Sequence, residues 1–174
     1  GEDGFEIIGL NVAVEKIWDK TLAAGKPFGC VPAGLGARDT LRTEVCYPLY
    51  GHELDESTFP AQAGLGRVVS LAKDGDFVGR AAVEAGPPAD ASVLVGLVSE
   101  GRRAGRAGYE VYDGESSVGA VTSGALSPTL GYPIAMAYVH PSLGEPGTPL
   151  LIDVRGTRIP ATVVSLPFYK REST

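Results

Sequence analysis

Val93-Leu94-Val95-Gly96-Leu97-Val98 opens a series of short apolar runs that fills the second half of the chain. Gly, Pro and Asp residues, which favour turns, separate the runs, and no helix is predicted among them. In order, the runs are Val93–Val98, Tyr109–Tyr112, Val118–Thr122, Ile134–Val139, Leu150–Val154 and Ile159–Val164. Six short strands at this spacing predict a small antiparallel barrel or sandwich.

The segment before these runs has a helical pattern instead. Asn11 is a predicted N-cap, and Gly25 is placed to end the helix that begins there. The apolar stripe between them has helical spacing and consists of Leu10, Val14, Ile17, Trp18 and Leu22. Two more helices are predicted over about 35–45 and 79–85, and Phe5–Ile8 predicts a strand ahead of the first helix.

The two patterns meet at Gly86-Pro87-Pro88-Ala89-Asp90, whose composition predicts a connector. We therefore expect an α+β chain in two parts, residues 1–86 and residues 87–174. Gly and Pro, with 24 and 13 residues, make up more than a fifth of the 174-residue chain. That proportion favours short strands and tight turns over a helical bundle.

Charge and composition weigh against several classes of function. A net charge of −6 and a pI near 4.9 argue against a nucleic-acid binder, and no apolar run approaches the roughly 18 residues of a membrane span. Cys30 and Cys46 lack metal-ligand spacing, so we expect free thiols in a reducing compartment, the cytoplasm. Because the chain opens on a turn-like Gly1–Gly4 stretch without Met, we interpret it as part of a longer protein.

Few side chains indicate chemistry by their local spacing. His52 and His140 are the only histidines, and neither belongs to a recognisable Ser/His/Asp arrangement. The acidic cluster of Glu2, Asp3 and Glu6 lacks the ligand spacing of a metal site. The basic segment Gly101–Arg106 in an acidic chain is either a solvated turn or a loop that contacts an anion.

Two arginines stand on the side of a predicted helix that also carries apolar residues. Arg38 and Arg42 lie four residues apart over 35–45, with Leu35 and Val45 on the same side. A charged group on the buried side of a helix requires a partner. We therefore expect these arginines to be paired.

Several segments resemble the glycine cleavage T-protein family, in the family's order and at its spacing. They are Gly1–Ile7 (GEDGFEI), Gly34–Arg42 (GLGARDTLR), Leu49–Glu56 (LYGHELDE), Asp76–Arg80 (DFVGR), Thr122–Leu130 (TSGALSPTL) and Ile134–Val139 (IAMAYV). The chain departs from the family at Thr43 and Val45-Cys46, where the family's LRLEAG pattern has Leu and Ala-Gly. The resemblance implies the end of a folate-binding α/β domain followed by a six-stranded antiparallel β-barrel.

The resemblance also implies a reaction. T proteins transfer the aminomethyl carbon from the lipoyl arm of H protein to tetrahydrofolate, giving 5,10-methylenetetrahydrofolate and ammonia in glycine catabolism. The expected partners are therefore lipoylated H protein and tetrahydrofolate. Glu6 matches the glutamate that recognises the pterin, and Arg38 matches a folate-binding arginine. Tyr47 lies where some members of the family have a folate-contacting tyrosine, and Arg171, near the end of the chain, is a weaker match for a similar role.

No residue here matches the family's catalytic aspartate, which the family carries in its N-terminal half. The resemblance places Arg38 as a buried guanidinium beside Glu6, where a structural ion pair is the alternative role.

Two other functions remain open from the sequence. One is the folate-binding half of a dimethylglycine or sarcosine dehydrogenase, in which a flavin domain precedes this one. The other is a non-catalytic folate-binding protein of assembly or repair, whose usual KGC(Y/F)xGQE motif this chain lacks.

Overall fold

The structure, a computed structural model, describes residues 4–171 of the chain. The predicted turn at Gly1–Gly4 and the acids Glu2 and Asp3 therefore fall largely outside the described residues. The chain forms two compact units, residues 1–38 and residues 39–174. Neither this division nor any other observation tests the predicted division at residue 86, which stays a prediction.

The described residues ahead of the barrel form three α-helices: α1 (Asn11–Gly25), α2 (Leu35–Glu44) and α3 (Arg80–Ala85). A 3-10 helix, η1 (Lys26–Phe28), follows α1, and Gly29 ends it in the left-handed conformation at φ 76°. The helices predicted over 35–45 and 79–85 are thus confirmed within a residue of their ends. No helix among the described residues has the length and apolar character needed to cross a bilayer.

Three local predictions in this half are wrong. Gly25 is the last residue of α1, in the right-handed conformation, and Lys26 takes the C-cap position, so Gly25 is not a terminating glycine beyond the helix. Asn11 is the first residue of α1 and not its cap, because Leu10 holds the extended N-cap position and no side chain caps the helix. Phe5–Ile8 is irregular and exposed rather than a strand. A strand needs a neighbour for its backbone hydrogen bonds, and no described segment pairs with these residues.

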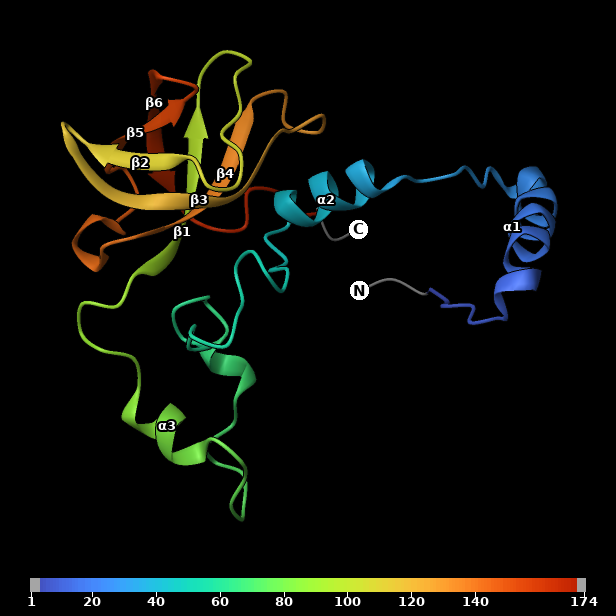
Figure 1. Cartoon of the computed structure of the whole chain (residues 1–174), viewed down its shortest axis with the longest axis horizontal. Helices are drawn as coiled ribbons and strands as arrows, with labels where there is room; N and C mark the ends of the chain where they lie inside the picture. Colours follow the sequence, from blue (N-terminus) through green and yellow to red (C-terminus); the bar gives the residue numbers. More distant parts are fainter. Residues whose placement is uncertain (1–3, 172–174) are drawn as a thin grey trace. The chain divides into compact units, whose positions relative to one another are not determined.

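The second half is a closed barrel of six antiparallel strands in the order β1-β4-β3-β2-β5-β6 (Figure 1). The strands are β1 (Val93–Ser99), β2 (Glu110–Asp113), β3 (Ser116–Leu126), β4 (Pro133–Val139), β5 (Pro149–Val154) and β6 (Thr157–Val164). Each overlaps one of the six predicted runs, and closure decides between barrel and sandwich. Closure leaves no strand edge unpaired.

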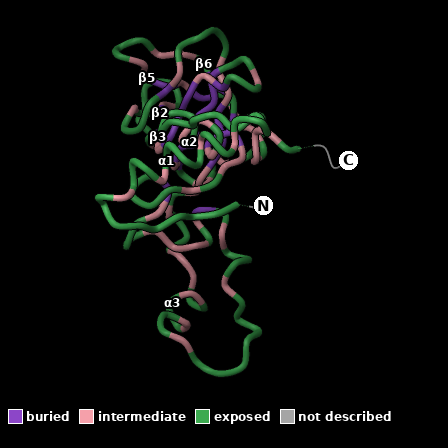
Figure 2. The backbone as a smooth tube through the Cα atoms, turned by 90° about the vertical axis from the view of Figure 1, so that its right-hand side faces the viewer, coloured by how far each residue is buried: buried purple, intermediate pink, exposed green. Residues whose placement is uncertain are grey.

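The core of the barrel consists of side chains that alternate inward along the strands. Figure 2 shows the buried residues concentrated in the barrel. The buried core cluster is Val95, Leu97, Val111, Val121, Ala135, Ala137, Val139, Leu150, Ile152, Ala161 and Val163. Two 3-10 helices, η2 (Gly66–Val68) and η3 (Pro141–Leu143), lie in the connections.

The outer side of β4 is also buried. Ile134 and Met136 alternate with the interior residues of β4, yet both are almost fully buried. Hydrogen bonds join the barrel to the segment after α2. The Tyr138 hydroxyl of β4 donates to the Glu53 carbonyl at 2.8 Å, and the Leu94 amide, ahead of the part of β1 that pairs with β6, donates to the Gln62 carbonyl at 3.0 Å. The segment from residue 39 to 63 therefore packs on the outside of the barrel.

Candidate functional site

The predicted folate residues Glu6 and Arg38 are both exposed. Among the described residues no hydrogen bond or ion pair joins them. The side of α2 that was expected to be buried around Arg38 is open, since Leu35 is 83% exposed. The expectation of a buried guanidinium beside Glu6 is therefore wrong for this structure, because no described side chain covers that turn of α2.

Arg42, one turn later on α2, is the arginine that meets partners. Its side chain is only 11% exposed. Its Nη1 lies 2.9 Å from Glu53 Oε2, and its Nη2 donates to Ser123 Oγ at 2.8 Å and to Asp39. The predicted need for a partner is thus confirmed for Arg42. The contact with Ser123 of β3 fixes this part of α2 on the barrel.

Glu53 is the centre of this network, and its side chain is fully buried. Its carboxylate accepts from Arg42, from the Leu49 amide at 3.0 Å and from the Ser123 hydroxyl. His52 lies beside the network but is exposed, with Nδ1 2.9 Å from the Thr122 carbonyl oxygen. A buried carboxylate with this many donors is satisfied, so the network stabilises the junction of α2 and β3.

A second buried carboxylate belongs to Glu44, the last residue of α2. It accepts from the hydroxyl of Ser127, from the hydroxyl of Thr129 at 2.8 Å and from the Thr129 amide at 3.2 Å. Ser127 Oγ also accepts from the Leu130 amide at 2.9 Å. The loop after β3 thus wraps the end of α2 with its polar groups.

These two networks were missed by reasoning from the sequence. Their hydroxyl partners Ser123, Ser127 and Thr129 all belong to the segment Thr122–Leu130 that carries the family resemblance. The signal was the number of hydroxyls in a segment bounded by buried strands, because hydroxyls near a core require acceptors or donors. Neither carboxylate partner could be assigned, since they lie about 70 and 83 residues earlier in the chain.

Tyr47 and Arg171 are the other predicted folate contacts. Tyr47 is exposed just after α2, with its amide donating to the Arg42 carbonyl at 2.8 Å. Arg171 is exposed at the end of the described chain. Cys46, the residue before Tyr47, has a left-handed φ of 58°. Glycine adopts this conformation most readily, and glycine is the residue that the family pattern has at this position.

Two groups near Glu53 hold their protons tightly. Burial raises the pKa of the Cys46 thiol to about 11. A hydrogen bond with the Phe168 backbone lowers this pKa, and the nearby charge of Glu53 raises it further. Burial, followed by the charges of Glu53 and Asp55, raises the pKa of Tyr138 to about 12. Both groups are therefore neutral near pH 7, and neither is suited to act as a base there. Across the described residues no three His, Cys, Asp or Glu side chains cluster to hold a metal.

Comparison with known proteins gives two family matches in sequence. The GCVT N-terminal domain matches residues 1–73, and the glycine cleavage T-protein C-terminal barrel domain matches residues 93–170. The chain belongs to the glycine cleavage T-protein family. The C-terminal barrel match covers the six strands.

Individual relatives agree with this family. An aminomethyltransferase of Cutibacterium acnes is 55% identical over 171 residues, covering 98% of this chain and 46% of the relative. One of Streptomyces avermitilis is 54% identical, with 99% and 48% covered. The crystal structure of the glycine cleavage system aminomethyltransferase T from Bartonella henselae matches with a TM-score of 0.78 and 32% identity over 91% of this chain and 44% of that one. The chain spans about half the length of the curated relatives it matches.

Proposed function

We propose that this T-protein family chain supplies the folate-facing part of a tetrahydrofolate-dependent aminomethyltransferase. The observation that carries the proposal is the pair of T-protein domain matches, in order, over residues 1–73 and 93–170. Relatives named aminomethyltransferase, about half identical along nearly the whole chain, favour this activity over a flavin-linked dehydrogenase or a repair protein.

The proposed reaction moves one carbon between two large ligands. The aminomethyl carbon leaves the lipoyl sulfur of H protein and ends between N5 and N10 of tetrahydrofolate, while ammonia and the dihydrolipoyl arm are released. Tetrahydrofolate supplies the nucleophilic nitrogen. The task of the protein is to hold the two ligands in register and to manage protons, and positioning of this kind accounts for a large share of catalysis.

Glu6 and Arg38 carry the proposed folate contacts. The Glu6 carboxylate can accept paired N–H donors from a pterin ring, and the Arg38 guanidinium offers a rigid fork of donors. Both groups are exposed and make no hydrogen bond or ion pair with described residues. Their donor and acceptor chemistry therefore fits tetrahydrofolate. Tyr47 and Arg171 are proposed as secondary contacts.

The remaining roles are positional. None of the residues of this chain is proposed as the catalytic acid. The Arg42–Glu53 and Glu44–Ser127 networks hold the end of α2 on the barrel. We propose lipoylated H protein as the partner and the cytoplasm as the location, and the free Cys30 and Cys46 thiols support a reducing compartment.

The folate contacts are tested by calorimetric titration with tetrahydrofolate. The protein to use is a chimera in which this chain replaces the matching residues of the Cutibacterium acnes relative. A charge-assisted hydrogen bond is worth roughly 1.5–3 kcal/mol, so Arg38→Ala and Glu6→Gln should each weaken binding about 10- to 150-fold. Arg158→Ala, on β6 of the barrel, is the control and should leave affinity unchanged. Unchanged affinity in both test variants would remove the assignment.

A further inference from the structure

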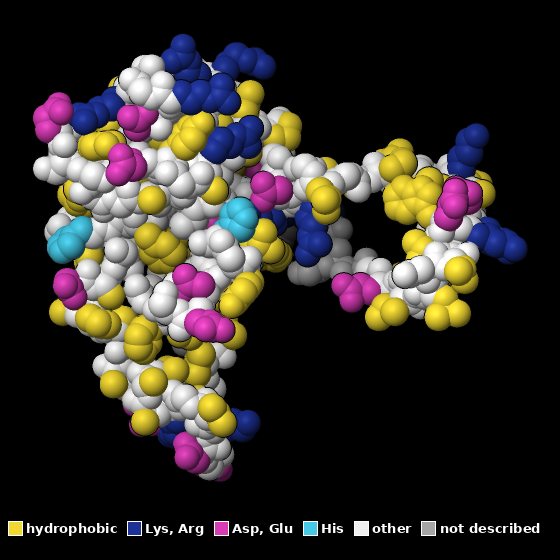
Figure 3. Space-filling model, in the orientation of Figure 1, with side chains coloured by type: hydrophobic (Ala, Val, Ile, Leu, Met, Phe, Trp, Pro, Cys, Tyr) yellow, Lys and Arg dark blue, Asp and Glu magenta, His cyan; other side chains and the backbone are white. Residues whose placement is uncertain are grey.

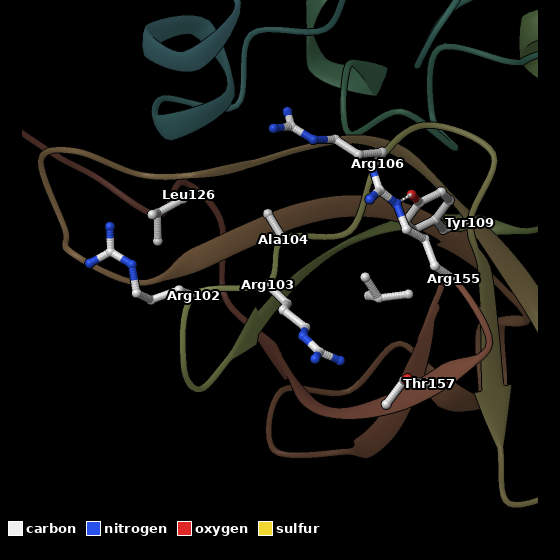
Figure 4. Close-up of a pocket in the computed structure, with 9 residues that line it drawn as sticks. Arg102, Arg103, Ala104, Arg106, Tyr109, Leu126, Arg155 and Thr157 are labelled. Atoms are coloured by element: carbon white, nitrogen blue, oxygen red, sulfur yellow. Dashed lines mark hydrogen bonds between the residues drawn. The ribbon is translucent and has the colours of Figure 1, made fainter.

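A cavity of about 650 Å³ lies among the loops at one end of the barrel. Four arginines line it. Arg102, Arg103 and Arg106 come from the connection between β1 and β2, and Arg155 comes from the turn between β5 and β6 (Figure 4). The rest of the wall is Ala104, Tyr109, Leu126, Val154 and Thr157. Arg102, Arg103 and Arg106 belong to the basic segment Gly101–Arg106, for which the sequence allowed either a solvated turn or a loop that contacts an anion.

The charge of this cavity is of one sign. The whole chain has a net charge of −6, yet none of the nine described residues that line the cavity is Asp or Glu. Basic side chains gather at one end of the barrel surface (Figure 3). Concentrated positive charge in a hollow attracts anions more strongly than the same charge on a flat surface.

The arginines keep most of their hydrogen-bonding capacity free. Arg102 and Arg103 make no side-chain hydrogen bond or ion pair with described residues. Arg106 donates one bond, from Nη1 to the Gly124 carbonyl at 3.0 Å, and Arg155 donates one long bond, from Nε to the Tyr109 hydroxyl at 3.4 Å. Each guanidinium carries five N–H donors. Among the described residues, the cavity wall therefore presents many unused donors and no carboxylate.

The arrangement favours a ligand with several separated charges. Figure 4 shows the guanidinium groups distributed around the cavity and not converging on one point. Each arginine fork can bind one carboxylate or phosphate group through two parallel hydrogen bonds. A single phosphate would therefore contact only one or two of the four guanidinium groups. Apolar wall residues such as Leu126 and Val154 suit the spacer between charges. We infer that the cavity binds an extended small-molecule oligoanion, with two or more carboxylate or phosphate groups on a short spacer.

The test is calorimetry on the full chain at fixed ionic strength, with three probes: triglutamate, tripolyphosphate and orthophosphate. We expect triglutamate or tripolyphosphate to bind at least tenfold more tightly than orthophosphate. The tighter of the two identifies the ligand as an oligocarboxylate or an oligophosphate, and either outcome supports the inference. Equal affinity for orthophosphate would overturn the extended ligand.

Variants separate the cavity from general charge. Arg102→Gln with Arg103→Gln should weaken binding at least tenfold while leaving the melting temperature unchanged, because both side chains are exposed and unpaired among the described residues. The matched control, Arg67→Gln with Lys73→Gln, removes two exposed positive charges elsewhere and should change affinity less than twofold. Equal loss in both double variants would overturn the inference, since affinity would then follow net charge. Binding of none of the probes would overturn it as well.

Discussion

Cys46 reports on the packing beside the end of α2. Burial raises its pKa to about 11 from an ordinary 9.0, and the thiolate is the reactive form. That rise lowers the thiolate fraction near pH 8 about 100-fold. In a Cys30→Ser variant, alkylation of Cys46 by iodoacetamide should be slow at pH 8 and rise about tenfold per pH unit up to about pH 11. Mass spectrometry across that range measures it, and a plateau near pH 9 would show that the thiol is not buried.

Arg38 and Arg42 lie one turn apart on α2 but differ in burial: Arg38 is exposed, and the Arg42 side chain is mostly buried in an ion pair. Removing one member of a buried ion pair costs about 3–5 kcal/mol, so Arg42→Ala should lower the free energy of unfolding by that amount. Exposed substitutions usually stay within about 0.5 kcal/mol, so Arg38→Ala should leave stability unchanged. Urea unfolding of both variants is the measurement. Equal losses would mean that Arg38 is also part of the buried network.

The same two residues show what the sequence could predict. Spacing alone showed that a charge on α2 required a partner, which Arg42 has. The sequence did not show that Glu53 and Ser123 are the partners, because they lie 11 and 81 residues away and meet Arg42 only when the segment after α2 packs on the barrel. The folate roles of Glu6, Arg38, Tyr47 and Arg171 came from resemblance, and they stay predictions.

Among the elements, β3 and β4 bring two backbones close together at Gly119. A Cβ placed on Gly119 would overlap the Tyr138 carbonyl oxygen. Backbone must shift to accept it, and overpacking of this kind costs about 1–3 kcal/mol. We expect Gly119→Ala to lower the melting temperature. Gly36→Ala, on α2 with no described atom within 4 Å of where its Cβ would lie, is the control and should be neutral or stabilising by up to about 1 kcal/mol.

An unchanged melting temperature for Gly119→Ala would contradict the register of these strands.

The elements differ in how far the sequence predicted them. The six strands were predictable because each apolar run is bounded by turn residues. The longer extent of β3, to Leu126, was not, because Gly124 and Ser123 are residues typical of turns. The strand predicted over Phe5–Ile8 was wrong for a different reason: an apolar segment forms a strand only where a neighbouring segment can pair with it.

At the scale of the whole molecule, the residues up to 35 expose much apolar surface. Phe5 and Ile8 are 96% and 95% exposed, and no residue of α1 is buried. Apolar surface of this extent promotes association. The chain by itself should therefore self-associate, with a weight-average sedimentation coefficient that rises between about 5 and 100 μM. Phe5→Ser with Ile8→Ser should reduce the rise, while a concentration-independent monomer would contradict the prediction.

We propose that this chain forms part of an aminomethyltransferase and supplies positioning residues without the catalytic acid. The most direct measurement is formation of 5,10-methylenetetrahydrofolate from aminomethylated H protein and tetrahydrofolate. We expect no turnover by the 174-residue chain alone. The Cutibacterium acnes chimera should turn over within about tenfold of its parent's rate. A larger loss, of about 100-fold, is what misplaced binding groups alone would cause. A folded but inactive chimera, or turnover by the chain alone near the parent's rate, would contradict the account.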